Sequence, residues 1–159
     1  MTPRRAWSLR GKRAVDVVPF SRGSNISVLA AMRTDGISAW QAYDGAVNGE
    51  RFLEFLETKL GPTLRPGDVI VLDNVRFHHM QAVREAVQRR GARLVFIPAY
   101  HPELNAIEEL FSFLKSSLRR QKARTLHDLM TAIQKAFDAA DYRRIAAFMR
   151  HALKLSVQP

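Results

Sequence analysis

The sequence predicts an α/β fold in which a mixed sheet is flanked by helices, and three observations indicate it. Short runs rich in Val and Ile, joined by turns, come first. Two continuous apolar runs separated by a helical pattern follow, and the rest of the chain has helical periodicity alone. The 159 residues suit one domain with one core, so we expect a single domain over residues 1–159.

The first elements have the pattern of an antiparallel meander. Residues 14–19 (AVDVVP), 26–32 (ISVLAAM) and 37–43 (ISAWQAY) are predicted strands. Turn-forming residues lie between them, at 22–25 and 34–36. Strands with such short connections pair antiparallel, so we expect three adjacent antiparallel strands.

The middle of the chain has the order helix, strand, helix, strand. Asn48 is a predicted N-cap for a helix over 48–60. Residues 69–72 (VIVL) are uniformly apolar, which indicates a strand buried on both faces. A helix from about 79 to 90 and a second apolar strand at 94–97 follow. Two strands joined through a helix in this way form a parallel pair.

The last third is predicted to be helical. One helix runs from about 105 to 120. Thr125 and Asp128 have the spacing of a capping box at the start of a second helix, and Asp141 is the predicted cap of a third. These helices supply the remaining apolar faces of the core.

The net charge of +10 is concentrated at the two ends of the chain. Residues 1–13 contain five basic residues and no acid, and residues 115–159 contain ten basic residues and three acids. This distribution favours a polyanionic partner such as nucleic acid, although a generically basic protein is the alternative. The chain has no cysteine, which excludes disulfides and thiolate metal sites and fits a cytoplasmic location. No apolar run is long enough for a membrane span, so we expect no membrane partner.

Two acidic residues follow the two buried strands. Asp73 comes directly after 69–72, at the sheet edge where α/β proteins bind ligands, although it could merely cap the next helix. Glu108 lies in the first turn of the helix after the second strand, on the side near the core. Complementing the helix dipole is the alternative for both Glu108 and Glu109, and it is sufficient for Glu109.

The segments VLDNVRFHH and PAYHPELNAIEELFSFLK resemble the bacterial insertion-sequence branch of the mariner superfamily of DDE transposases. The Asp-Asn pair, the Pro-rich loop and the spacing from Asp73 to Glu108 all match that family. His101 and Ala106 depart from it, since the family usually has serine and proline there. The segment AWSLRGKR also matches, so the resemblance extends over most of the chain.

This resemblance implies a ribonuclease-H-like fold that cleaves DNA at transposon ends and joins them to target DNA, using Mg²⁺ or Mn²⁺. Asp73 and Glu108 would be the catalytic residues and the metal ligands. Supporting residues behind these ligands would be Asn74, His78 and Asn105. Residues that would contact DNA phosphates are Lys115, Arg119, Arg120, Lys122 and Arg124. A solvated basic face is the alternative for this last group, and zinc binding by histidine is disfavoured because no suitable spacing occurs.

The start of the chain departs from the family. The family's first catalytic aspartate, usually within Asp-Glu, lies on a strand before the Trp-Gly segment, whereas only Met1–Ala6 precede Trp7 here and none of them is acidic. We therefore expect an N-terminally truncated catalytic domain that lacks the first strand and is inactive alone. Its partners would be DNA and either a second copy or a fragment from an upstream reading frame. A non-catalytic DNA-binding or transposase-interacting remnant is the alternative, and the Pro-rich loop argues against a junction resolvase.

Overall fold

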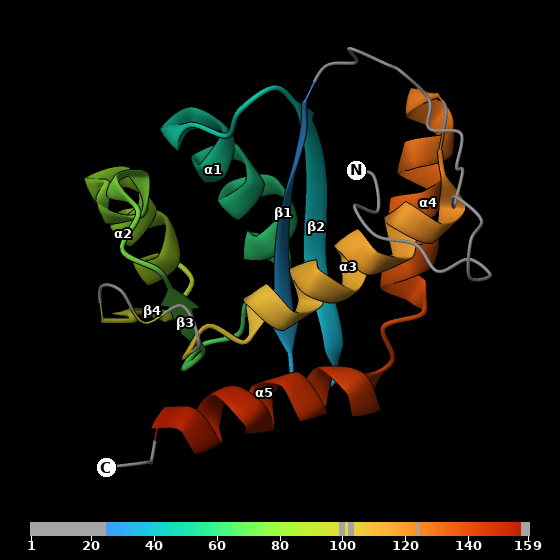
Figure 1. Ribbon diagram of the computed structural model, residues 1–159. Helices are drawn as coiled ribbons and strands as arrows, with labels where there is room; N and C mark the ends of the chain where they lie inside the picture. The colour runs from blue at the N-terminus through green and yellow to red at the C-terminus, as the bar shows by residue number, and fades with distance from the viewer. Residues whose placement is uncertain (1–24, 99–100, 102–103, 124, 157–159) are drawn as a thin grey trace, which may run out of the picture.

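The computed structural model describes residues 25–98, 101, 104–123 and 125–156. Within these residues, two short sheets lie among five α-helices (Figure 1). The elements in chain order are β1 (Ile26–Arg33), β2 (Gly36–Asp44), α1 (Gly49–Phe55), β3 (Val69–Leu72), α2 (Gln81–Gln88), β4 (Arg93–Phe96), α3 (Ile107–Gln121), α4 (Leu126–Asp138) and α5 (Tyr142–Ser156). The strand expected at 14–19 and the basic segment 1–13 lie outside the described residues.

The β1–β2 hairpin confirms the antiparallel pairing expected for the second and third strands. Its register runs from Ile26 opposite Asp44 to Arg33 opposite Gly36. Gly36 has a φ of +148°, a conformation that side chains with a Cβ rarely adopt, and this glycine closes the turn. The tight connection therefore fixes the register of the hairpin.

The strands β3 and β4 form the expected parallel pair, from Val69 opposite Arg93 to Leu72 opposite Phe96. The backbone N–H of Ile97 donates to the carbonyl of Leu72 at 2.8 Å and extends the pairing. The helix α2 connects the two strands, preceded by a 3₁₀ turn at Arg76–His79. The helix expected from about 79 to 90 is therefore present as the slightly shorter α2, and the 3₁₀ turn before it was not predicted.

The structure has the predicted mixed α/β architecture, but the prediction that β3 is buried on both faces is wrong. Within the described residues, β1 pairs only with β2 and β3 pairs only with β4, which leaves two separate two-stranded sheets. Val69, Val71 and Val95 are 45%, 52% and 48% exposed. The physical reason is that one face of β3–β4 packs against the core beside α1 and α2, while no described strand joins β3 to β1.

Two hydrophobic clusters pack on the hairpin. One contains α1, the π-helical turn Leu56–Leu60 that continues α1, and α2, and it contacts Leu29 and Ala31 of β1. The other contains α3, α4 and α5, and it contacts Val28 and Ala30 from the same strand. Figure 1 shows β1 and β2 between these two groups of helices. The hairpin is thus the centre of the molecule.

The caps of the helices follow the sequence. Asn48 accepts a hydrogen bond from the N–H of Arg51 at 3.0 Å at the start of α1. Thr125 and Asp128 form the expected capping box of α4. The N–H of Arg144 donates to the carboxylate of Asp141 at 2.9 Å, ahead of α5. No helix among the described residues has the length and apolar character needed to cross a membrane.

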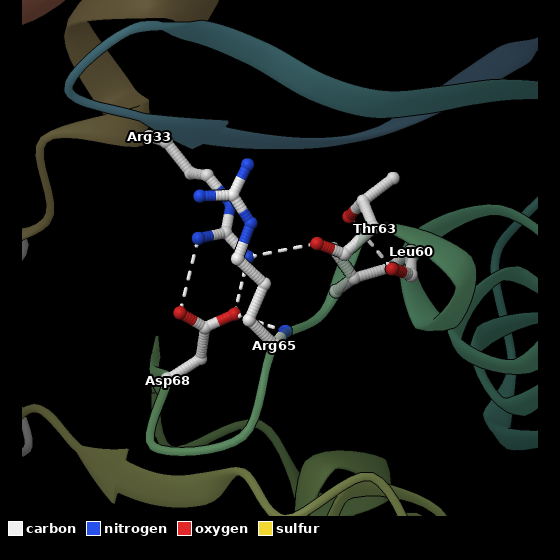
Figure 2. Close-up of polar contacts among 5 residues, drawn as sticks. All are labelled: Arg33, Leu60, Thr63, Arg65 and Asp68. Atoms are coloured by element: carbon white, nitrogen blue, oxygen red, sulfur yellow. Dashed lines mark hydrogen bonds and ion pairs between the residues drawn. The ribbon is translucent and has the colours of Figure 1, made fainter.

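An arginine links the hairpin to the start of β3 (Figure 2). Arg33, the last residue of β1, donates to Oδ1 of Asp68 and to the carbonyl of Thr63, each at 3.0 Å, and also contacts Oδ2 of Asp68. The N–H of Arg65 donates to Oδ2 of Asp68 at 2.6 Å. Both oxygens of Asp68 are therefore engaged. The contact joins the last residue of β1 to the residue directly before β3.

Candidate functional site

A cavity of about 710 Å³ lies between β1 and β3 and brings together several of the residues that the sequence singled out. Its walls are mostly apolar side chains from β1, β3 and α3. Asp73, His78, Asn105 and Glu108 also line it. Asp73 and Glu108, from different elements, therefore share one cavity, whose lining also includes Asp68 from the other end of β3.

Asp73 follows β3 directly, and its side chain is 48% exposed. Its Oδ1 lies 2.8 Å from Nδ1 of His78 and 3.4 Å from the backbone N of Val75. Within the described part of the chain, Oδ2 of Asp73 has no hydrogen-bond partner. Asp73 is thus anchored through one oxygen, and the other is available to a ligand.

Asn74 lies outside the lining of the cavity and joins the ends of the two parallel strands. Its Nδ2 donates to the carbonyl of Ile97, and its Oδ1 lies 3.1 Å from Nε2 of His79. The His79 ring stacks on Phe96 with centroids 4.1 Å apart. Asn74 therefore holds the carboxyl ends of β3 and β4 together behind Asp73.

Glu108 lies in the first turn of α3 and is exposed. Asn105 prepares this turn, because its carbonyl accepts from the N–H of Glu108 at 3.0 Å and its Oδ1 accepts from the N–H of Ile107 at 3.4 Å. The neighbouring Glu109 instead contacts Nδ1 of His151 on α5. Sequence reasoning did not find this contact, because the two residues are 42 positions apart.

The chemistry of these side chains fits a hard divalent cation. Carboxylate oxygens are the ligands that Mg²⁺ and Mn²⁺ prefer, and Asp73 and Glu108 both present them to the cavity. The described residues contain no group of three or more His, Cys, Asp or Glu side chains that could hold a metal. Within the described residues, the two carboxylates therefore do not make up a complete metal site.

The basic residues predicted to contact DNA lie on the later part of α3 and beyond it. Lys115, Arg119 and Arg120 are exposed on the helix. Lys122 ends the helix in the left-handed conformation, with φ of 48°. Arg124 lies outside the described residues. The same helix thus carries Glu108 at its start and a cluster of positive charge at its end.

The sequence of most of the chain is similar to that of a known nuclease family. Residues 1–130 match the family model described as DDE superfamily endonuclease. No curated protein matches the chain.

The fold is similar to solved structures of the Mos1 transposase. The Mos1 paired-end complex with the left transposon end has a TM-score of 0.78 at 18% identity, covering 95% of this chain and 47% of that chain. The Mos1 mariner paired-end complex with Mn has a TM-score of 0.79 at 18% identity, covering 96% and 48%. The Mos1 catalytic domain with Raltegravir and Mg has a TM-score of 0.68 at 18% identity, covering 86% and 76%. This chain therefore spans about half the length of the first two proteins and shares the ribonuclease-H-like fold of the Mos1 catalytic domain.

Proposed function

Because the chain belongs to the DDE superfamily endonucleases, we propose that it is catalytic-domain sequence of a transposase that cleaves DNA at transposon ends and joins them to target DNA. The observation that carries this proposal is that Asp73 and Glu108 line one cavity on a Mos1-like fold. The spacing and sequence around them resemble the bacterial insertion-sequence branch of the mariner superfamily, and we propose that origin for the chain. The activity would take place in the cytoplasm, on DNA.

Mg²⁺ or Mn²⁺ would activate the attacking oxygen and stabilise the leaving oxygen when bound at this cavity. Asp73 and Glu108 would hold the metal through carboxylate oxygens. His78 would orient Asp73, and Asn105 would orient Glu108 by setting the first turn of α3. Asn74 would keep the strand end behind Asp73 rigid. Each protein group therefore has a task in positioning the two ligands.

We further propose that a strand outside the described residues fills the gap between β1 and β3 and brings the third acidic side chain. Three facts support this: the inner edges of β1 and β3 are unpaired within the described residues, two valines of β3 are about half exposed, and the cavity between the strands is apolar. Unpaired strand edges of this kind readily accept another strand. Such a strand would run antiparallel to β1 and parallel to β3. The domain over residues 1–159 would then be complete only with that segment.

The basic residues of α3 and the loop after it would contact the phosphates of the DNA. Lys115, Arg119 and Arg120 are exposed on the helix that begins beside Glu108. Lys122 and Arg124 follow in the sequence and add two more positive charges. DNA bound along this helix would therefore reach the cavity, because the helix begins there.

The experiment that tests the site is a titration of the chain with Mn²⁺, using isothermal calorimetry. We expect weak binding, because two carboxylates leave the metal under-coordinated, and we expect Asp73→Ala or Glu108→Ala to remove it. Glu109→Ala is the matched control, because Glu109 lies one residue away and contacts His151 instead. Equal binding by the parent chain and Asp73→Ala would contradict the assignment.

A second candidate is a non-catalytic protein that binds DNA or a transposase. The observation that favours it is the lack, among the described residues, of a third metal ligand beside Asp73 and Glu108. DNA binding without Mn²⁺ binding, and without cleavage by a chain extended at its N-terminus, would support this second function.

A further inference from the structure

We propose that His78 is a positioning residue that selects which oxygen of Asp73 faces the cavity, and that Phe52 of α1 holds His78 in the orientation for this selection. The proposal rests on the function proposed above, because it takes Asp73 as a metal ligand. The helix α1 contributes no acidic residue to the cavity lining. The proposal gives this helix a part in the geometry of the site.

The first step is the contact between the imidazole and the aspartate. Nδ1 of His78 lies 2.8 Å from Oδ1 of Asp73 and 3.2 Å from the backbone carbonyl of the same residue. Both of these oxygens are acceptors, so Nδ1 carries a hydrogen, which it donates to the backbone carbonyl while Oδ1 lies in ion-pair contact with the same ring. One ring nitrogen thus contacts Asp73 at both its side chain and its backbone, which fixes the carboxylate relative to the end of β3.

The second step is the difference between the two carboxylate oxygens. Oδ1 lies 2.8 Å from Nδ1 of His78, an ion-pair contact, and accepts from the N–H of Val75 at 3.4 Å. Within the described part of the chain, Oδ2 receives no such donor. A cation competes with hydrogen-bond donors for the lone pairs of an oxygen, so Oδ2 is the oxygen left for a metal. Asp73 would then bind through a single oxygen.

The third step is the packing that holds the imidazole. The centroid of the His78 ring lies 4.4 Å from that of the Phe52 ring and 4.7 Å from that of the Phe77 ring. The contact with Phe77 is edge-on. The side chain of His78 is 11% exposed, and Phe52 is 5% exposed within the first hydrophobic cluster. The ring cannot rotate without displacing these neighbours, because protein interiors are closely packed. The core around α1 therefore sets the direction of the Nδ1–H bond.

The adjacent His79 provides a comparison within the same turn. It is exposed, stacks on Phe96 and contacts the side chain of Asn74 rather than Asp73. Two neighbouring histidines of the sequence thus have different surroundings, and only one of them touches the proposed ligand. His79 is the matched control for His78.

The test measures Mn²⁺ affinity by calorimetry and the unfolding midpoint in EDTA, in the full chain and its variants. His78→Phe keeps a ring against Phe52 and loses the donor, and we expect affinity to fall about tenfold or more, the scale typical of groups that orient metal ligands. His78→Asn places an amide donor near the position of Nδ1, and we expect it to recover most of the affinity. Phe52→Leu should weaken binding while His78 is still present, and His79→Phe should leave affinity unchanged.

The outcomes separate this inference from the proposed function. Loss of binding in Asp73→Asn together with unchanged binding in His78→Phe would overturn the inference and leave the proposed function standing. Unchanged binding in Asp73→Asn would overturn the proposed function itself. If His78→Phe unfolds, the comparison of His78→Asn with the parent decides: near-parental affinity supports a donor at this position, and a loss as large as that of His78→Ala contradicts it.

Discussion

The two ends of β3 carry an aspartate each, and the two residues have opposite surroundings. Asp68, before the strand, has both oxygens held by Arg33 and by the N–H of Arg65. Asp73, after the strand, is held through Oδ1 alone and is 48% exposed. A carboxylate whose oxygens are all engaged can join elements together, whereas one with an unengaged oxygen can bind a ligand. The comparison indicates a structural role for the first and a chemical role for the second.

The largest expected effect at the Asp73 end concerns DNA cleavage. We expect the 159-residue chain alone not to cleave DNA, and a chain extended at its N-terminus by a strand carrying Asp-Glu to cleave with Mg²⁺. In the extended chain, Asp73→Ala should reduce cleavage by on the order of 10⁴-fold, as when one member of a catalytic group is removed. A strand-cleavage assay on purified monomer measures both.

The control for this prediction is Asp68→Ala in the extended chain, which should retain cleavage as long as the chain is folded. Cleavage by the 159-residue chain alone that disappears in Asp73→Ala would show that another acid, such as Asp16, supplies the third carboxylate. That result would contradict the truncated-site interpretation, and Asp16 lies outside the described residues.

The second prediction concerns DNA affinity, which should depend on the basic residues at the end of α3 and just after it. This helix begins at the cavity that Asp73 lines. Replacing Arg119, Arg120, Lys122 and Arg124 by Ala should weaken binding to duplex DNA and flatten its dependence on salt. The slope should fall by about one unit for each phosphate that the variant no longer neutralises. Arg65→Ala is the control at the opposite end of β3, because its exposed side chain lies beside Asp68. A slope unchanged by the fourfold variant would mean that these residues contact solvent only.

The third prediction concerns stability, where the Asp68 end should matter more. Arg33→Met removes the ion pair and the hydrogen bond to the carbonyl of Thr63, which together join the hairpin to the loop before β3. We expect a thermal unfolding midpoint lower by a few degrees, with Mn²⁺ affinity unchanged. Arg51→Met, which also removes hydrogen bonds from an arginine to backbone carbonyls, is a control for loss of surface hydrogen bonds. An unchanged midpoint in Arg33→Met would show that the contact does not stabilise the fold.

The smallest expected effect is the pH dependence of that same contact. The hydrogen bonds from Arg33 and then from the N–H of Arg65 hold the pKa of Asp68 below its usual value of 3.8. A lowered pKa in the folded state means that the contact stabilises the fold above the unfolded value and that this stabilisation disappears as the pH falls through the folded value. The difference in unfolding midpoint between the parent and Asp68→Asn should therefore be constant from about pH 5 to 8. It should shrink below about pH 4, as circular dichroism would show.

Local features of this fold could be predicted from the sequence because they depend on neighbouring residues. The hairpin strands, the parallel pair and the capping box of Thr125 and Asp128 were each expected and are present. The four residues of β3 were also located correctly. Their burial was not, because it depends on a neighbouring strand that the described residues do not supply.

The surroundings of the candidate site could not be predicted, because they depend on residues distant in sequence. Arg33 and Asp68 are 35 positions apart, and nothing in the turn before β3 indicates that an arginine holds its aspartate. The sequence HH at 78–79 does not indicate which histidine meets Asp73. In the structure, the histidine that meets Asp73 is the one packed on Phe52, and this contact depends on how α1 packs.

The position of the hairpin between the two clusters opposes one kind of folding error, a shift in the register of β1. Along β1, alternate residues belong to different clusters: Leu29 and Ala31 pack with one set of helices, Val28 and Ala30 with the other. A shift of the strand by one residue would exchange every one of these side chains between the two clusters at once. In a forward shift, Leu29 would meet the site shaped for Ala30 in one cluster, and Val28 would leave a void at the site of Leu29 in the other. Both sets of helices therefore depend on the same register of β1, and a slipped strand would pack poorly against each of them.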